Sequence, residues 1–407
     1  MTSAFPASLT ATFTAEWPRV VGATLRSFGN LDLAEECAQE AFTRAAEAIA
    51  RGEPIDNIGA WATTTARRIA IDSLRRDSVL EAKLPLLVDD HHETDDPEDA
   101  SGVDDRLGLV FVACDPILSP EQRVALALRI VCGVPTADIA DFFGVPEPTL
   151  AARLTRAKKA ISRSGERFEW PEGAARAARL DAVLTTIYGV YTLGHTANTG
   201  DELSDARLGA LALELARSVV TEFGGDTEAL GLLALIELGE ARRPARTRND
   251  GMPLTLAEVD RSAWGRQRIT RGLELAARAL PGGGRFALQA GIAGLHSSAP
   301  SWQETDWPTI VTLYHGLLRV WPAPVVKLGL LVARSHLGPE ELARVAAELA
   351  AMPTDRRVAA ALADIEERRG EVDAALAALR LARDGETNAA ILRYYDRAEQ
   401  RLRDRLR

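Results

Sequence analysis

The sequence predicts an all-α protein, and three observations support this fold class. Ala, Leu, Arg and Glu dominate the 407 residues, and runs of β-branched residues are short. Apolar residues recur at three- and four-residue spacing along most of the chain, which is the pattern of amphipathic helices. Gly and Pro are spread out rather than concentrated, which argues against extensive disorder. The length and an apolar fraction of 46% suit two or three packed domains.

Residues 8–85 predict a first domain of three helices. Two helices are expected over residues 11–28 and 31–50, with a turn at Gly29 and Asn30 between them. Asn57 can cap the third helix through its side-chain oxygen. The second helix carries polar side chains on its outer side, at Asp32, Glu35, Glu36, Gln39 and Glu40. The third helix carries arginines, at Arg67, Arg68, Arg75 and Arg76. One domain therefore offers an acidic and a basic surface to different partners.

Residues 86–105 predict a flexible, solvated linker, because nine of these twenty residues are acidic and few are apolar. His91 and His92 lie beside these acids. A lone His-His-Glu in such a tract is more typical of a polar linker than of a metal site, so no metal is expected.

Residues 106–167 predict a second small domain that contains a helix-turn-helix. Ser119 is expected to cap a helix with a proline in its first turn, and Thr136 to cap the next short helix. Gly144 can take the positive φ that ends that helix. From residue 149 to residue 167 the chain has six basic residues and one acidic residue, within a chain of net charge −10. This local reversal of sign is typical of an element that contacts phosphates. A helical hairpin with a solvated basic face is the plainer interpretation.

Residues 168–407 predict a larger domain of helical hairpins. Gly338 and Gly370 each separate two expected helices, and they are followed by two similar stretches, PEELARVAAELA and EVDAALAALRLA. Their spacing of 32 residues is close to the tetratricopeptide period. A tetratricopeptide-like solenoid is therefore expected, and an irregular helical bundle is the alternative.

The sequence shows no motif that indicates catalysis, a cofactor or a membrane span. No phosphate-binding loop, zinc motif or nucleophile elbow occurs, and four histidines after residue 190 are isolated in the sequence. No signal peptide or bilayer-length apolar run is evident. Cys37, Cys114 and Cys132 are too scattered for a disulfide framework, so buried thiols in a cytoplasmic protein are expected.

The first two domains resemble the sigma-70 family of RNA polymerase sigma factors, in the extracytoplasmic-function (ECF) group. The resemblance is carried by DLAEECAQEAF at residues 32–42, WATTTARRIAIDSLRR at residues 61–76 and the helix-turn-helix at residues 119–161. The third domain is similar to the long tetratricopeptide-like extension of some of these factors. The chain departs from the family at Asp115, where a His is usual, and at Thr192 and Leu193, where Asn-Glu is usual.

The resemblance implies a bacterial transcription factor that is not an enzyme and that binds the β′ clamp and β flap of core RNA polymerase and promoter DNA. The residues implied for polymerase binding are Asp32, Glu35, Glu36, Gln39, Glu40 and Phe42. The residues implied for the −10 element are Trp61, Arg67, Arg68, Asp72, Arg75 and Arg76. The residues implied for the −35 element are Thr136, Thr149, Ala152, Arg153, Thr155, Arg156, Lys158 and Lys159.

The extension is expected to regulate activity, in cis or through a bound regulatory protein, because helical arrays offer concave binding surfaces. Two other classes fit the residues alone. One is a conventional DNA-binding regulator with a helical sensor domain, and the other is a helical interaction scaffold. Promoter-specific initiation with core polymerase would distinguish a sigma factor from both.

Overall fold

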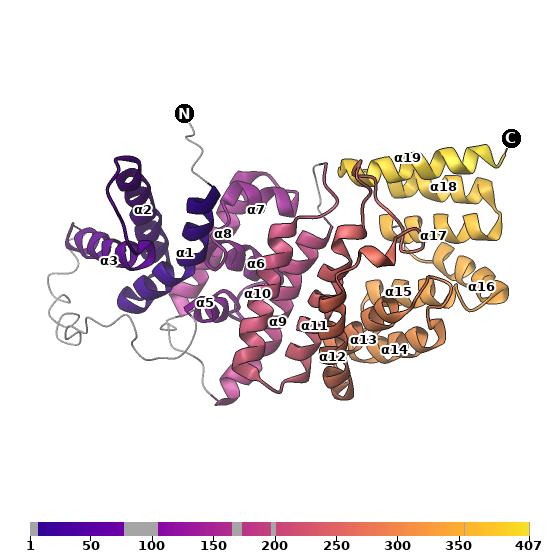
Figure 1. Ribbon diagram of the computed structural model, residues 1–407, viewed down its shortest axis with the longest axis horizontal. Helices are drawn as coiled ribbons and strands as arrows, with labels where there is room; N and C mark the ends of the chain where they lie inside the picture. The colour runs from indigo at the N-terminus through magenta and orange to yellow at the C-terminus, as the bar shows by residue number, and fades with distance from the viewer. Residues whose placement is uncertain (1–6, 77–104, 165–172, 197–200, 354, 407) are drawn as a thin grey trace. The chain divides into compact units, whose positions relative to one another are not determined.

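The computed structural model describes residues 7–76, 105–164, 173–196, 201–353 and 355–406. Within them the fold is all-α, and the only bridge of β type joins Thr247 to Pro253. The chain divides into two compact units, residues 1–189 and 190–407 (Figure 1). The predicted linker at residues 86–105 lies outside the described residues except for Asp105, which begins a helix. Every described helix is too short or too polar to cross a lipid bilayer.

The first unit contains seven helices in the described residues and most of an eighth. They are α1 (Ala7–Phe28), α2 (Leu31–Ala50), α3 (Ile58–Arg76), α5 (Asp105–Ala113), α6 (Pro120–Ile130), α7 (Thr136–Phe143), α8 (Glu147–Ser164) and α9 (Gly173–His195). Helices α1, α2 and α3 pack against one another around alanines that have no exposed surface, such as Ala38 and Ala66. Small side chains at these positions let the helix axes approach closely.

Local sequence signals set the helix ends in this unit. The Asn57 side chain accepts from the N–H of Ala60 at 3.0 Å, at the start of α3. Ser119 and Gln122 form a reciprocal capping box at the start of α6. The prediction for Thr136 was wrong, because α7 begins at Thr136 itself and Pro135 occupies the cap position without a side-chain hydrogen bond. The rigid φ of Pro135 already directs the chain into the helix.

The two small predicted domains pack together in one unit. The indole of Trp17 on α1 donates to the carbonyl of Ile130 on α6 at 3.1 Å, and α1 also packs against α5. The start of α9 belongs to the same unit, although the sequence predicted a boundary at residue 168. Cys114 donates to Thr186 of α9 at 3.1 Å. Burial raises the pKa of the Cys114 thiol to about 12, so this cysteine is an inert packing residue.

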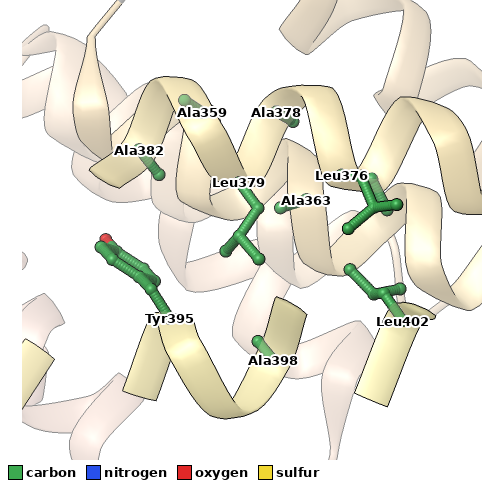
Figure 2. Close-up of a cluster of buried hydrophobic side chains, with 10 residues drawn as sticks. Ala359, Ala363, Leu376, Ala378, Leu379, Ala382, Tyr395, Ala398 and Leu402 are labelled. Carbon is green, nitrogen blue, oxygen red and sulfur yellow. The ribbon is translucent and has the colours of Figure 1, made fainter. Parts of the chain in front are cut away.

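The second unit is built from helices that pack mostly on their neighbours in the chain. They are α10 (Ala206–Phe223), α11 (Thr227–Arg242), α12 (Arg266–Ala279), α13 (Arg285–Ser298), α14 (Trp307–Val320), α15 (Pro324–Arg334), α16 (Pro339–Ala350), α17 (Arg356–Arg369), α18 (Val372–Arg383) and α19 (Ala389–Asp404). Short 3₁₀ helices cover Arg243–Ala245, Arg261–Ala263 and Leu280–Gly282. Figure 2 shows small and leucine side chains between α17, α18 and α19.

The last helix contacts the beginning of this unit as well as its neighbour. Asn388 donates to the carbonyl of Glu202 at 2.9 Å, Arg393 donates to the carbonyl of Asp201 at 2.9 Å, and Arg397 pairs with Glu258. In an open solenoid each repeat contacts only its neighbours. Most helices of the second unit therefore pack on their neighbours in the chain, as in a tetratricopeptide array. The contacts of its last helix with residues at the start of the unit are a feature that an open array lacks.

Candidate polymerase and nucleic-acid interfaces

Helix α2 presents four of the polar residues that the sequence placed on its outer side. Asp32, Glu36, Gln39 and Glu40 are exposed, and Glu40 pairs with Arg44 at 2.8 Å. Two of the predicted polymerase contacts are not available. Phe42 is 6% exposed and packs against Phe13 and Trp17, with ring centroids 5.1 and 5.9 Å apart. Its position on the inner stripe of α2 makes it a core residue.

Glu35 is buried, so its predicted position on the outer side was wrong. One carboxylate oxygen accepts from Arg129 of α6, and the other lies 2.8 Å from the Lys158 ammonium of α8. Lys158 also pairs with Asp32 at 2.8 Å. Burial of the ammonium lowers the pKa of Lys158, but the carboxylates of Glu35 and Asp32 outweigh it and the net pKa is raised. The group stays charged, and the cluster joins three helices of the unit.

Helix α3 exposes most of the arginines that were predicted to contact the −10 element. Arg67, Arg68 and Arg75 are exposed, as is Asp72, and Trp61 is half-buried. Ala62, Ala66 and Ala70 have no exposed surface and face the core. The last predicted residue, Arg76, ends the helix. The exposed guanidiniums therefore lie on the side of α3 opposite its packed stripe, where phosphates have access to them.

Helices α7 and α8 form the predicted helix-turn-helix. Gly144 ends α7 with φ +62, and Leu150, Leu154 and Ala157 are buried along the inner side of α8. The opposite side of α8 exposes five of the predicted −35 contacts, at Thr149, Ala152, Thr155, Arg156 and Lys159. Thr136, at the start of α7, is half-buried. The exposed set lies in the first turns of α8 and along its outer side, as a helix entering a major groove requires.

Two predicted DNA contacts on α8 have protein partners in this structure. The Arg153 guanidinium lies 5.6 Å from the centroid of the Phe143 ring. Lys158 pairs with the carboxylates of α2 and is therefore not free to bind a phosphate.

Arg129 was not identified from the sequence as a structural residue. A charged residue within the apolar pattern of α6 nevertheless indicates a buried partner of opposite charge.

Asp115 occupies the position where the resembling family usually has a His. The side chain is 6% exposed, accepts from the N–H of Ile117 at 2.8 Å and lies 3.9 Å from Arg179 of α9. The aspartate therefore fixes the turn between α5 and α6 and contacts the helix that follows the helix-turn-helix.

Models of known protein families match three stretches of the chain. Sigma-70 region 2 matches residues 12–79, sigma-70 region 4 matches residues 116–161, and a family of unknown function, DUF6596, matches residues 179–280. An uncharacterized protein of Rhizobium meliloti (strain 1021), R00370, is 40% identical over 335 residues, which are 79% of this chain and 78% of the relative. No solved structure matches.

Named sigma factors also match. The probable ECF RNA polymerase sigma factor SigI of Mycobacterium tuberculosis (strain ATCC 25618 / H37Rv) is 27% identical over 162 residues, 38% of this chain and 55% of the relative. The ECF RNA polymerase sigma factor SigC of Mycobacterium tuberculosis (strain CDC 1551 / Oshkosh) is 29% identical over 137 residues, 33% of this chain and 70% of the relative.

A three-helix domain followed by a helix-turn-helix, both matched by sigma-70 models, defines a promoter-recognition protein of transcription initiation. The chain belongs to the sigma-70 family, as an ECF-type factor with a C-terminal extension. Binding to core RNA polymerase and promoter DNA follows from membership of this family.

Proposed function

We propose that this sigma factor contacts the β′ clamp of core polymerase through the exposed polar residues of α2 and contacts the two promoter elements through α3 and α8. The observation that carries the proposal is the separation of charge in the first unit. Acidic side chains are exposed on α2, while arginines are exposed on α3 and basic and small residues on α8. The exposed acids of α2 have the sign that a basic polymerase surface requires, and the exposed arginines of α3 and basic residues of α8 have the sign that phosphates require.

On α2 the contact rests on Asp32, Glu36, Gln39 and Glu40. Exposed charges of this kind contribute more to orientation and association rate than to affinity. Because Phe42 belongs to the core, the apolar part of the polymerase contact comes from other residues. Glu35 is not part of this contact, because it pairs with Arg129 and Lys158 inside the unit.

On α3 the exposed Arg67, Arg68 and Arg75 hold the phosphates of an opened −10 strand, and Asp72 lies near a base turned out of the stack. On α8 the small residues Thr149 and Ala152 permit close approach to base edges. Arg156 and Lys159 contact bases or phosphates.

The second unit modulates these activities, either directly or through a bound regulatory protein.

Transcription in vitro with core polymerase tests the proposal. The full chain is expected to give promoter-specific initiation, whereas core polymerase alone is not. Arg156→Ala is expected to reduce initiation about tenfold, because a contact between a guanidinium and a base or phosphate is lost. The matched control on the same helix is Arg163→Ala, which is exposed but outside the predicted contact set.

Capture of core polymerase tests the α2 contact separately. Glu36→Lys is expected to weaken capture, while Glu47→Lys on the same helix leaves it unchanged, since Glu47 lies three turns beyond Glu36 and is not among the predicted contacts. A chain that binds a defined duplex without polymerase, and gives no start-site selectivity, would instead be a conventional DNA-binding regulator.

A further inference from the structure

A small cavity in the second unit has a lining that is positively charged and otherwise mostly apolar. Its volume is about 200 Å³, and it lies between the end of α9, the end of α11 and the segment that leads to α12. The lining residues are His195, Gly239, Arg242, Arg246, Leu254, Leu256, Val259 and Trp264. None of them is acidic, and all lie in the stretch matched by the family of unknown function.

Two guanidiniums of this cavity have no carboxylate partner among the described residues. Arg242 donates through Nε to the carbonyl of Leu238 at 3.3 Å, and Arg246 donates one terminal N–H to the carbonyl of His195. The acids nearest to them in the sequence, Glu240 and Asp250, already pair with Arg243 at 2.8 Å and with Arg248 at 2.5 Å. Arg242 and Arg246 therefore keep further N–H donors free for a ligand.

Trp264 adds a buried N–H donor to the cavity lining. The side chain is 4% exposed, and its indole Nε1 has no hydrogen-bond partner in the described part of the chain. A buried donor left in this state costs about 1–3 kcal/mol. The Arg261 guanidinium lies 4.8 Å from the centroid of the indole ring and adds a third positive charge beside the cavity.

The electrostatics of the cavity favour a negatively charged occupant. Burial is the main cause that lowers the pKa of both Arg242 and Arg246. Tyr191 acts in the opposite direction on both, as Glu240 does on Arg246, and neighbouring arginines lower the two pKa values further. Burial and the same two arginines lower the pKa of His195 to about 3, so its imidazole is neutral. Burial in the cavity therefore disfavours the charged guanidiniums of Arg242 and Arg246. A bound anion would offset the free energy of burying these positive charges.

We propose that this cavity binds a small anion, namely a carboxylate or phosphate group carried by a short apolar molecule. The forked donors of arginine match both groups, and the indole N–H supplies one more donor. Leu254, Leu256 and Val259 provide apolar walls for the rest of the ligand. The cavity is smaller than the range of about 300–1,000 Å³ for drug-sized ligands, which limits the ligand to a small metabolite. The site does not depend on the proposed promoter contacts.

Titration calorimetry on the full chain tests this site with three probes: inorganic phosphate, propionate and phenylacetate. Sodium chloride at equal ionic strength is the control for screening. Saturable binding of at least one probe is expected. The comparison of phosphate with the two carboxylates identifies the headgroup, and the comparison of propionate with phenylacetate measures the contribution of the apolar walls.

Variants locate the binding in this cavity. Arg242→Met is expected to weaken binding at least about tenfold, because a charged hydrogen bond is lost. Trp264→Phe keeps the packing, removes only the donor and is expected to weaken binding about threefold to tenfold. Arg248→Met is the matched control, since this arginine is exposed and pairs with Asp250 outside the cavity.

The proposal is overturned if no probe binds saturably beyond the chloride control. It is equally overturned if Trp264→Phe binds every probe as tightly as the native chain, and this variant remains informative if Arg242→Met does not fold. Equal loss of binding in Arg248→Met and Arg242→Met would show a general charge effect and would also reject the site.

Discussion

At the scale of single residues, burial decides which charged groups can meet a partner. Glu35 and Glu36 are neighbours in the sequence, yet Glu35 is enclosed by Arg129 and Lys158 and Glu36 is exposed. A charge in the interior is tolerated only with a partner of opposite sign. Neighbouring acids on one helix therefore have different roles, one in holding the unit together and one on its surface.

Removal of the Glu35 carboxylate is expected to destabilise the first unit. Glu35→Ala leaves the Arg129 guanidinium, which is 16% exposed, without its partner and is expected to lower the free energy of unfolding by about 3 kcal/mol. The exposed Glu40→Ala is the control, with an expected change below about 0.5 kcal/mol. Urea unfolding followed by circular dichroism measures both. Equal effects of the two variants would contradict the buried pair.

Two histidines in the second unit make its stability depend on pH. His296 and His336, which the sequence suggested were isolated, lie in a ring cluster with Trp302 and Trp307, and His336 stacks on Trp307 at 3.9 Å. Burial, reinforced by neighbouring positive charge, lowers the pKa of each histidine to about 4, from an ordinary 6.5. Their neutral forms are therefore the ones that the folded chain stabilises.

The sign of the effect follows from linkage. The unfolded chain binds more protons below pH 6.5, so stability is complete above that value and falls as the pH decreases toward about 4. The expected slope is at most about 1.4 kcal/mol per pH unit for each histidine. His336→Phe keeps an aromatic ring on Trp307 and is expected to flatten the dependence. The same change of unfolding free energy with pH in the native chain and in His336→Phe would contradict the role of this histidine.

At the scale of elements, the turn of the helix-turn-helix depends on one backbone conformation. Gly144 has φ +62, and a Cβ added there would meet no atom within 4 Å. The cost of Gly144→Ala is therefore the backbone strain alone, about 1–2 kcal/mol. Gly225→Ala is the control, because its site is equally open and its φ is not in the left-handed region. Comparable denaturation midpoints for the two variants would reject the argument.

The elements themselves were largely predictable. The predicted second helix has the observed bounds, Leu31–Ala50, and Ser119 forms the expected cap. These features depend on the spacing of apolar residues and on hydrogen bonds within one turn. The predicted cap at Thr136 was wrong, because Pro135 occupies the cap position without a side-chain hydrogen bond. Cap positions at two adjacent residues such as Pro135 and Thr136 differ too little in free energy for the sequence pattern to distinguish them.

At the scale of the whole molecule, α9 decides where the sigma-like unit ends. Thr186 contacts Cys114, and a Cβ at Gly189 would lie 2.5 Å from the Val124 side chain, so α9 packs closely on the preceding domain. A chain that ends at residue 167 loses this cover. We expect it to be less stable than a chain that ends at residue 196, as measured by thermal unfolding. Equal midpoints would show that α9 contributes nothing to the unit.

The role of the extension is best tested with a chain that keeps all of α9. A comparison of transcription by the full chain and by a chain that ends at residue 167 would mix a loss of regulation with a loss of stability. A chain that ends at residue 196 retains the contacts to Thr186 and Gly189 and removes most of the second unit. Its activity relative to the full chain gives the sign of regulation.

The sequence by itself determined the fold class, the helix order and the family, because apolar spacing, capping residues and short motifs are local properties. Only the tertiary structure decided which charged groups are paired. Glu35 accepts from a residue 94 positions away, and α19 returns to residues 201–258. Such pairings depend on the packing of distant helices. The unpaired arginines of the small cavity arise in the same way, because no local pattern shows which guanidiniums lack a carboxylate.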